Sequence, residues 1–201
     1  MSKEKYNIIG DVHGRFDLLM ELIAKMPLRD FIFVGDLIDR GPNPIEVVDW
    51  VIKTRSVCVL GNHEHMMLDF YKQTKRYDFN TWFRNEGDVT FDAYEKDKKT
   101  LNDHLNFIDN LPTKFESDHL IVTHAPTIHH DKMNVFDAVW CRRPSKKIPN
   151  GKTHIYGHQG MRYEGKNERG IITSICIDNS AVGELIGMTW PEKEYFSVQE
   201  K

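Results

Sequence analysis

The first 70 residues alternate between short apolar runs that end in glycine and longer runs with helical spacing. The apolar runs at residues 6–10, 30–34 and 56–60 are typical of buried strands. Between them, residues 16–26 and 45–53 carry apolar side chains every three or four positions, which indicates helices with one buried face. The order strand–helix–strand–helix–strand predicts an α/β sheet with crossover connections and helices on its faces.

The remainder of the chain has a different character. Residues 71–117 are charged and helix-compatible, so we expect a helical insertion packed beside the sheet. Further strands are expected, mostly antiparallel after the loop, at residues 119–123, 154–156, 171–177 and 184–189, with a long loop at residues 131–151. No repeat or linker interrupts the 201 residues, and 40% of them are apolar, so a single domain over residues 1–201 is expected.

Polar clusters follow three early strands and two later ones. In an α/β sheet, ligands bind at the carboxyl ends of the strands, so we expect these clusters to meet at one edge of one sheet. The glycines beside them allow the backbone to turn sharply and approach a small ligand closely. The clustered side chains are Asp11, His13, Asp36, Asn62, His124 and His158.

This mixture of carboxylate, imidazole and amide groups suits two adjacent divalent cations. A pair of metal ions needs one anionic bridging ligand, and Asp36 is the natural choice because it lies between the other clusters in sequence. The chain has 10 histidines, and no thiolate accompanies the clusters, which favours Mn, Fe or Zn over Ca or a structural zinc site. We expect Asp11 and His13 on one metal, and Asn62, His124 and His158 on the other.

Each cluster also has a plainer interpretation. Asp36 beside glycine could form a turn, Asn62 could cap a helix, and a single histidine is more often structural. Two other motifs fail. Residues 151–153 resemble the end of a P-loop, but Lys146 stands where its first glycine is required. His154 and His158 have the spacing of a helical zinc site, but the segment between them is typical of a strand and a turn.

Composition excludes several other classes. The net charge of −3 and the lack of a basic–aromatic patch argue against binding to nucleic-acid duplexes or anionic membranes. No stretch of about 18 apolar residues and no signal-peptide core occurs, so we expect no membrane association. The 3 cysteines have no paired spacing, which indicates a reducing compartment and a cytoplasmic location. The oligomeric state stays open.

The clusters together resemble the phosphoprotein phosphatase (PPP) branch of the calcineurin-like metallophosphoesterases. The matching motifs are GDVHG at 10–14, GDLIDRG at 35–41, GNHE at 61–64, THAP at 123–126 and GHQ at 157–159. Within this family the compact chain is similar to bacterial and bacteriophage Ser/Thr protein phosphatases and to symmetric diadenosine tetraphosphatases. The resemblance implies a four-layered α/β/β/α sandwich with mixed sheets.

The resemblance also implies roles for individual residues. The metal ligands are the six named above, with Mn²⁺ as the expected metal and Fe, Zn, Co or Ni as alternatives. His63 is implied as the general acid, oriented by Asp39, which agrees with its place beside a ligand asparagine. Arg40 is implied as a phosphate clamp and Arg142 as a second phosphate-binding arginine.

The implied reaction is hydrolysis of phosphate monoesters by a water bridged between two metals, as in a serine/threonine-type protein phosphatase. The alternative is hydrolysis of dinucleoside polyphosphates or RNA caps, because Leu60 replaces the arginine that protein phosphatases carry in RGNHE. That change would remove a phosphate contact, whereas Ser180 in place of a family glycine affects only a turn. A third hypothesis is a non-catalytic scaffold that keeps the fold and binds partners. The substrate is expected to be a phosphoprotein, a nucleotide or another small phosphate ester, selected by the insertion and by residues 127–152.

Overall fold

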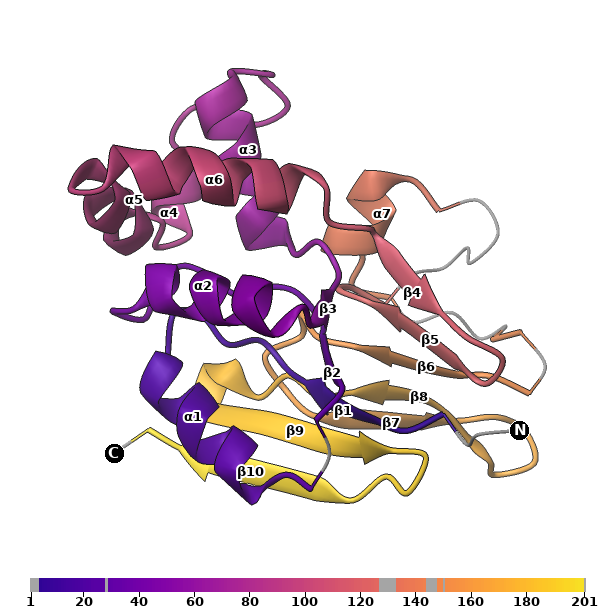
Figure 1. Cartoon of the computed structure of the whole chain (residues 1–201). Helices are drawn as coiled ribbons and strands as arrows, with labels where there is room; N and C mark the ends of the chain where they lie inside the picture. Colours follow the sequence, from indigo (N-terminus) through magenta and orange to yellow (C-terminus); the bar gives the residue numbers. More distant parts are fainter. Residues whose placement is uncertain (1–3, 28, 127–132, 144–147, 150, 201) are drawn as a thin grey trace.

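Two five-stranded sheets pack face to face, with helices against the outer face of the first sheet (Figure 1). The computed structural model describes residues 4–27, 29–126, 133–143, 148–149 and 151–200. Both sheets are mixed, so the expected α/β sandwich with two mixed sheets is confirmed; the described helices cover the outer face of the first sheet, and a fourth, helical layer over the second sheet remains a prediction. The prediction of one domain remains a prediction.

The first sheet contains the three strands expected near the N-terminus. They are parallel, and β2 lies between β1 and β3. The last two strands of the chain extend this sheet antiparallel, beyond β1. The bounds are β1 Tyr6–Ile9, β2 Phe31–Phe33, β3 Val57–Cys58, β9 Glu184–Trp190 and β10 Tyr195–Gln199.

The second sheet differs from the prediction in two respects. Its three inner strands, β5, β6 and β8, are parallel, so the expected antiparallel arrangement is wrong for β6 and for its pairing with β8, whereas β9 in the first sheet is antiparallel to both of its neighbours. Its edge strands β4 and β7, like β10 in the first sheet, were not predicted, because each is short, polar and only partly buried. The bounds are β4 Lys114–Glu116, β5 Leu120–Thr123, β6 Thr153–Tyr156, β7 Tyr163–Lys166 and β8 Ile172–Cys176.

Alternation along the strands builds two apolar layers. Ile8 and Ile32 point into the layer between the sheets, and their neighbours Ile9 and Phe33 point towards the helices. The helices α1 (Phe16–Lys25) and α2 (Pro44–Thr54) contribute one apolar face each to the second layer. Burial on both faces explains why these strands read as continuous apolar runs.

The helical insertion predicted at residues 71–117 starts earlier than expected, directly after β3, and the end of the predicted range forms strand β4 instead. Helix α3 starts at Asn62 and is followed by three further helices that extend beyond α2 (Figure 1). A second expectation, the long loop at residues 131–151, is wrong in its described part, which contains helix α7 (Val135–Trp140); residues 131, 132, 144–147 and 150 lie outside the described residues. The insertion helices are α3 Asn62–Lys72, α4 Thr81–Arg84, α5 Asp88–Glu95 and α6 Lys98–Asp109.

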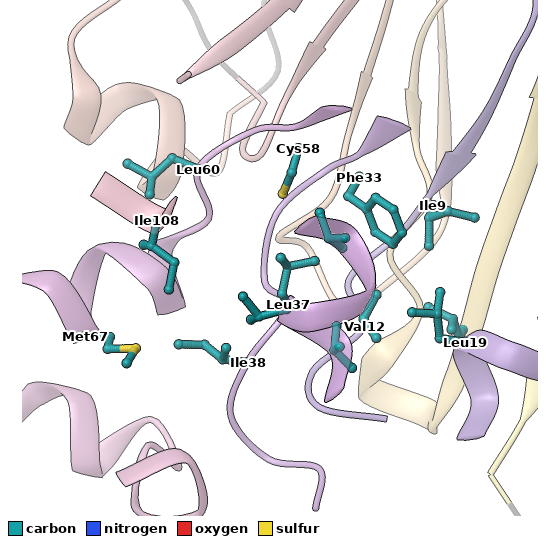
Figure 2. Close-up of a cluster of buried hydrophobic side chains, with 14 of the residues drawn as sticks. Ile9, Val12, Leu19, Phe33, Leu37, Ile38, Cys58, Leu60, Met67 and Ile108 are labelled. Carbon is teal, nitrogen blue, oxygen red and sulfur yellow. The ribbon is translucent and has the colours of Figure 1, made fainter. Parts of the chain in front are cut away.

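Leu60 packs into the apolar layer that joins the insertion to the first sheet. Its side chain is buried in the same cluster as Met67 and Ile108 (Figure 2), and its backbone N–H donates to the carbonyl of Pro112 at 2.8 Å. Leu60 thus contributes to packing, and the loss of a phosphate contact at this position stays a prediction.

Among the described residues, none of the helices is both long and apolar enough to cross a membrane.

Candidate active site

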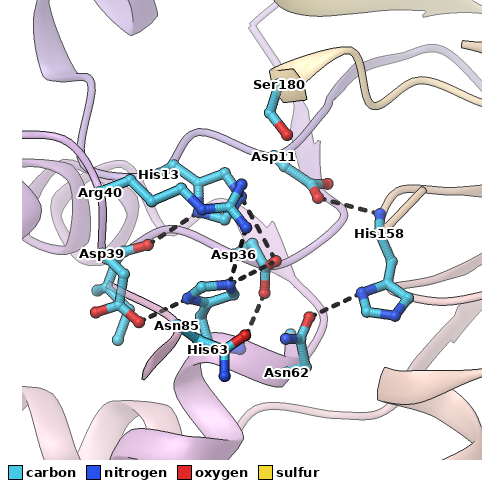
Figure 3. A network of polar contacts seen from close by, with 12 residues as sticks. Asp11, His13, Asp36, Asp39, Arg40, Asn62, His63, Asn85, His158 and Ser180 are labelled. Carbon is cyan, nitrogen blue, oxygen red and sulfur yellow. Dashed lines mark hydrogen bonds and ion pairs between the residues drawn. The ribbon is translucent and has the colours of Figure 1, made fainter. Parts of the chain in front are cut away.

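The six predicted metal ligands converge, but from both sheets rather than one. Asp11, Asp36 and Asn62 follow β1, β2 and β3 of the first sheet, whereas His124 and His158 follow β5 and β6 of the second. The expectation of a single sheet edge is therefore wrong, because the later ligands follow strands of a second sheet, and His158 from that sheet meets Asn62 from the first (Figure 3).

Asp36 lies at the centre of the group. Its Oδ1 is 3.4 Å from Nε2 of His124, and its Oδ2 is 3.7 Å from Nε2 of His13 and 3.9 Å from Nε2 of His63. A carboxylate with imidazole nitrogens on both of its oxygens has the arrangement that a bridging ligand requires. Burial raises the pKa of Asp36, but the neighbouring imidazoles outweigh this effect and hold its pKa below the usual range.

The second ligand set meets at the side-chain oxygen of Asn62. Nε2 of His124 lies 2.8 Å from Oδ1 of Asn62, and Nδ1 of His158 lies 2.9 Å from the same atom. Nδ1 of His124 is 2.8 Å from the carbonyl of Val34, so this nitrogen carries the proton and Nε2 presents a lone pair. Two lone pairs that face each other at this distance favour a cation near them.

Unpaired buried atoms also fit a metal site. Within the described residues, Oδ1 of Asp11 and Nε2 of His158 are buried without a hydrogen-bond partner. Burial lowers the pKa of His158 to about 3, with a further contribution from His124, so its imidazole is neutral at pH 7 and can act as a ligand. Burial likewise lowers the pKa of His13 and of His124. The donor set therefore fits two divalent cations.

Two compact groups of potential ligands share Asp36. It lies with His124 and His158 on one side, and with His13 and His63 on the other. Asp11 accepts the backbone N–H of His158 on its Oδ2 at 3.0 Å, and its place on the same metal as His13 stays a prediction. Asp11 thus connects the loop after β1 to the loop after β6, which carries His158. Burial and the charges of Asp178 and Asp36 raise its pKa, and a bound cation would oppose that effect.

Several site residues adopt left-handed backbone conformations that are unfavourable for side chains other than glycine. The backbone carbonyl of Asp36 accepts N–H groups from Val12 and His13 at 3.0 and 2.8 Å, which helps to hold these turns. Such turns reverse the chain directly after a strand and direct the side chains towards the cluster. The residues with positive φ are His13 (48°), Asp36 (51°), Asp39 (70°), Arg40 (66°) and His158 (65°).

Glu64 supports the loop that carries Asp36, a role that the sequence did not reveal. Its fully buried carboxylate accepts four backbone N–H groups, from Asp36, Leu37, Ile38 and Gly61, at 2.8 to 3.3 Å. Burial and the charge of Asp36 raise its pKa to about 7, although the backbone donors oppose this shift. Gly61 is required here because a Cβ would lie 2.3 Å from the backbone nitrogen of Asp36.

Replacing Glu64 with alanine is expected to destabilise the protein substantially. Each buried donor left unpaired costs roughly 1–3 kcal/mol, so we expect a loss of at least about 2 kcal/mol in the free energy of unfolding, measured by urea denaturation. The matched control is Glu21→Ala on the exposed face of α1, where an exposed ion pair with Lys25 contributes little. Equal stability of the two variants would contradict the supporting role of Glu64.

His63 and Asp39 form a buried pair beside the metal ligands. Nδ1 of His63 lies 2.6 Å from Oδ2 of Asp39, which leaves Nε2 directed towards Asp36. Burial lowers the pKa of His63, but the carboxylates of Asp36 and Asp39 outweigh this and raise it. The structure therefore provides a histidine with an orienting carboxylate, as a general acid requires.

Residues of the insertion complete the surroundings of Asp39. Nε1 of Trp82 donates to Oδ2 of Asp39 at 2.8 Å, and the Asp39 backbone N–H donates to Oγ1 of Thr90 at 2.9 Å. In the sequence, Trp82 and Thr90 both lie within the predicted helical insertion, and neither carries a signal of a role at the site. Both contacts depend on how the insertion folds back over the site.

The Arg40 guanidinium faces the same group of side chains. Its Nη1 lies 2.8 Å from Nε2 of His13 and its Nη2 lies 3.5 Å from Nε2 of His63. A metal ion that binds Nε2 of His13 would compete with the first of these contacts. The guanidinium of Arg40 would then be free of His13 but still at the cavity, where it could pair with an anionic ligand.

A cavity of about 280 Å³ opens over these residues. Arg142 lies exposed on its wall, as its predicted role requires, and half-buried Trp140 and Asn85 line it without having been predicted. Trp140 donates its indole N–H to Tyr77 at 2.6 Å, and its ring meets His158 edge to face. A cavity of about 310 Å³ beside α3 lacks such a donor cluster.

Comparison with known proteins agrees with this geometry. A family model described as calcineurin-like phosphoesterase matches residues 5–175. Serine/threonine-protein phosphatase 2 of Escherichia coli is 32% identical over 109 residues, which cover 52% of this chain and 49%, about half, of that relative.

One further relative and one solved structure match over nearly the whole chain. An asymmetrical bis(5'-nucleosyl)-tetraphosphatase, PrpE of Halalkalibacterium halodurans, is 27% identical over 98% of this chain and 94% of its own length. A metallophosphoesterase structure from Sphaerobacter thermophilus superimposes with a TM-score of 0.64 at 15% identity, covering 98% of this chain and 90% of the other.

Proposed function

This chain belongs to the calcineurin-like phosphoesterase family, and from that premise we propose that it hydrolyses phosphate monoesters of the serine/threonine phosphoprotein type. The observation that carries the proposal is Asp36, which lies between two sets of imidazole ligands and within 3.9 Å of His63. Metal ligands and a paired histidine in one cavity provide the parts that phosphoryl transfer to water requires.

Two divalent cations, Mn²⁺ in our proposal, would be held by Asp11, His13, Asp36, Asn62, His124 and His158. When bound, they would supply Lewis-acid stabilisation of the phosphoryl oxygens and lower the pKa of a water nucleophile. The sharing of Asp36 between both groups supports a paired rather than a single ion.

The chain's own residues complete the reaction. Arg40 and Arg142 line the cavity and offset the charge of the equatorial phosphoryl oxygens. As the water gives up one proton to solvent and forms the new P–O bond, the ester P–O bond breaks, and Nε2 of His63 donates a proton to the leaving oxygen. Asp39 holds His63 through Nδ1 and stabilises its protonated form. No side chain becomes phosphorylated.

Chelation is the first test of this function. With Mn²⁺ we expect the protein to hydrolyse p-nitrophenyl phosphate, to lose this activity in excess EDTA, and to recover it when Mn²⁺ is restored. Residual activity in EDTA would contradict a metal-dependent reaction. No activity with any of Mn²⁺, Fe²⁺, Zn²⁺, Co²⁺ or Ni²⁺ would favour a non-catalytic scaffold.

Hydrolysis of dinucleoside polyphosphates is the second candidate function. It is supported by the similarity to PrpE over almost the whole chain and by Trp140, an aromatic wall of the cavity on which a base could stack. Comparing kcat/KM for a phosphoserine peptide and for diadenosine tetraphosphate separates the two. A preference for the peptide supports the first proposal, and a preference for the dinucleotide supports the second.

All three cysteines belong to the described residues and are free thiols, and Cys58 and Cys176 are buried. This supports a reducing compartment, for which we propose the cytoplasm.

A further inference from the structure

The indole of Trp82 is fixed in one place against the catalytic pair. Trp82 is 1% exposed, and its ring packs against Phe70 and Phe83, with ring centroids 5.3 and 5.6 Å away. Gly87 leaves the space for it, because a Cβ at this position would lie 2.5 Å from Cδ1 and Nε1 of the indole. The N–H group therefore has little freedom to point elsewhere.

That N–H meets the one oxygen of Asp39 that also binds His63. Oδ2 of Asp39 accepts from Trp82 at 2.8 Å and from Nδ1 of His63 at 2.6 Å, while Oδ1 has no hydrogen-bond partner within the described residues. The carboxylate is thus held by two donors on a single oxygen. Without the indole N–H, one of the two donors that fix the rotation about the Cβ–Cγ bond is lost, so the carboxylate plane can turn and shift the oxygen that accepts from His63.

We propose that Trp82 is a positioning residue, whose N–H holds Asp39 in the orientation that directs Nε2 of His63 towards the leaving oxygen. The inference rests on the proposed general-acid role of His63. It gives the insertion a part in catalysis, because α4 carries Trp82 and the neighbouring helix α5 carries Thr90, which binds the backbone of Asp39.

Trp82→Phe tests this proposal, because phenylalanine keeps an aromatic ring but has no N–H. The readout is kcat for two aryl phosphates whose leaving groups differ in basicity, p-nitrophenyl phosphate and phenyl phosphate. A misplaced general acid slows release of the more basic phenoxide, so kcat for phenyl phosphate should fall roughly 10- to 100-fold. With p-nitrophenyl phosphate the change should stay within about 3-fold, and KM should be unchanged for both.

Two comparisons separate positioning from general damage. Trp50→Phe removes an indole from α2, where Trp50 packs on Phe31 and Phe33, and should leave both activities unchanged. In a His63→Asn background, Trp82→Phe should add no further loss, because residues that act through one another are not additive. An equal fall for both substrates, or a full additional loss in the double variant, would overturn the proposal.

A second variant covers the case in which Trp82→Phe unfolds. Gly87→Ala displaces the same indole N–H, and it should produce the same loss for phenyl phosphate alone. The His63→Asn variant tests the general-acid role separately. If it slows both substrates equally, that role is contradicted; if it slows phenyl phosphate selectively but Trp82→Phe does not, only the Trp82 proposal is contradicted.

Discussion

Asp36→Asn is expected to abolish metal binding and hydrolysis together. The amide has the shape of the carboxylate but no charge, so it cannot neutralise two cations or bridge them through both oxygens. Loss of an outer-shell partner alone lowers metal affinity by roughly 10- to 100-fold, so loss of the shared ligand should exceed about 100-fold. Titration calorimetry with Mn²⁺ measures the affinity, and p-nitrophenyl phosphate turnover measures the activity.

The control for this variant is Asp17→Asn, which removes a carboxylate from the exposed face of α1 and should change neither quantity. Circular dichroism should show Asp36→Asn folded, since asparagine can still accept the backbone N–H that His63 donates to Oδ1 at 3.1 Å. A folded variant that binds two Mn²⁺ ions with unchanged affinity would remove Asp36 from the bridging role.

His63→Asn is expected to slow turnover by roughly 10²–10⁴-fold, the usual contribution of a general acid. The metals should remain bound, because in our proposal His63 is not a ligand. Metal content by mass spectrometry and kcat for phenyl phosphate are the two measurements. The distinction matters because Nε2 of His63 lies as close to the Asp36 carboxylate as a ligand would, at 3.9 Å.

The metal content decides between the two roles of His63. A variant that retains two metals and loses turnover supports the general acid. A variant that loses one metal would make His63 a ligand, in agreement with its grouping with His13 and Asp36. In both cases Asp39 would still orient the His63 ring through the 2.6 Å contact with Nδ1.

The candidate ligands could be picked out from the sequence because each cluster directly follows a predicted strand. A buried apolar run, a glycine and a polar residue lie within a few positions of one another at Asp11, Asp36 and Asn62. Because β1, β2 and β3 are parallel neighbours in one sheet, their carboxyl ends bring these three side chains together. The early strands and helices were predictable for the same reason, since their apolar patterns are continuous.

Features that depend on distant contacts could not be predicted in this way. The division into two sheets depends on which strands pair, and apolar runs in β6 and β8 are alike for parallel and antiparallel neighbours. The Trp82–Asp39 hydrogen bond joins residues 43 positions apart, and nothing near Trp82 distinguishes it from an ordinary core residue. The left-handed turn at His13 is equally hidden, because glycine, not histidine, is the usual signal.

Glu64 could be predicted from the sequence only in part. Its place in GNHE marked it as part of a motif, but its role appears only when the loop after β2 folds onto α3. The carboxylate then binds backbone groups 26 to 28 residues away in sequence.

Anomalous diffraction from crystals grown with Mn²⁺ tests the central claim most directly. The account predicts two adjacent peaks that both contact the carboxylate of Asp36, one near His13 and the other near Asn62, His124 and His158. A single peak, or peaks away from Asp36, would contradict a paired metal centre in this chain.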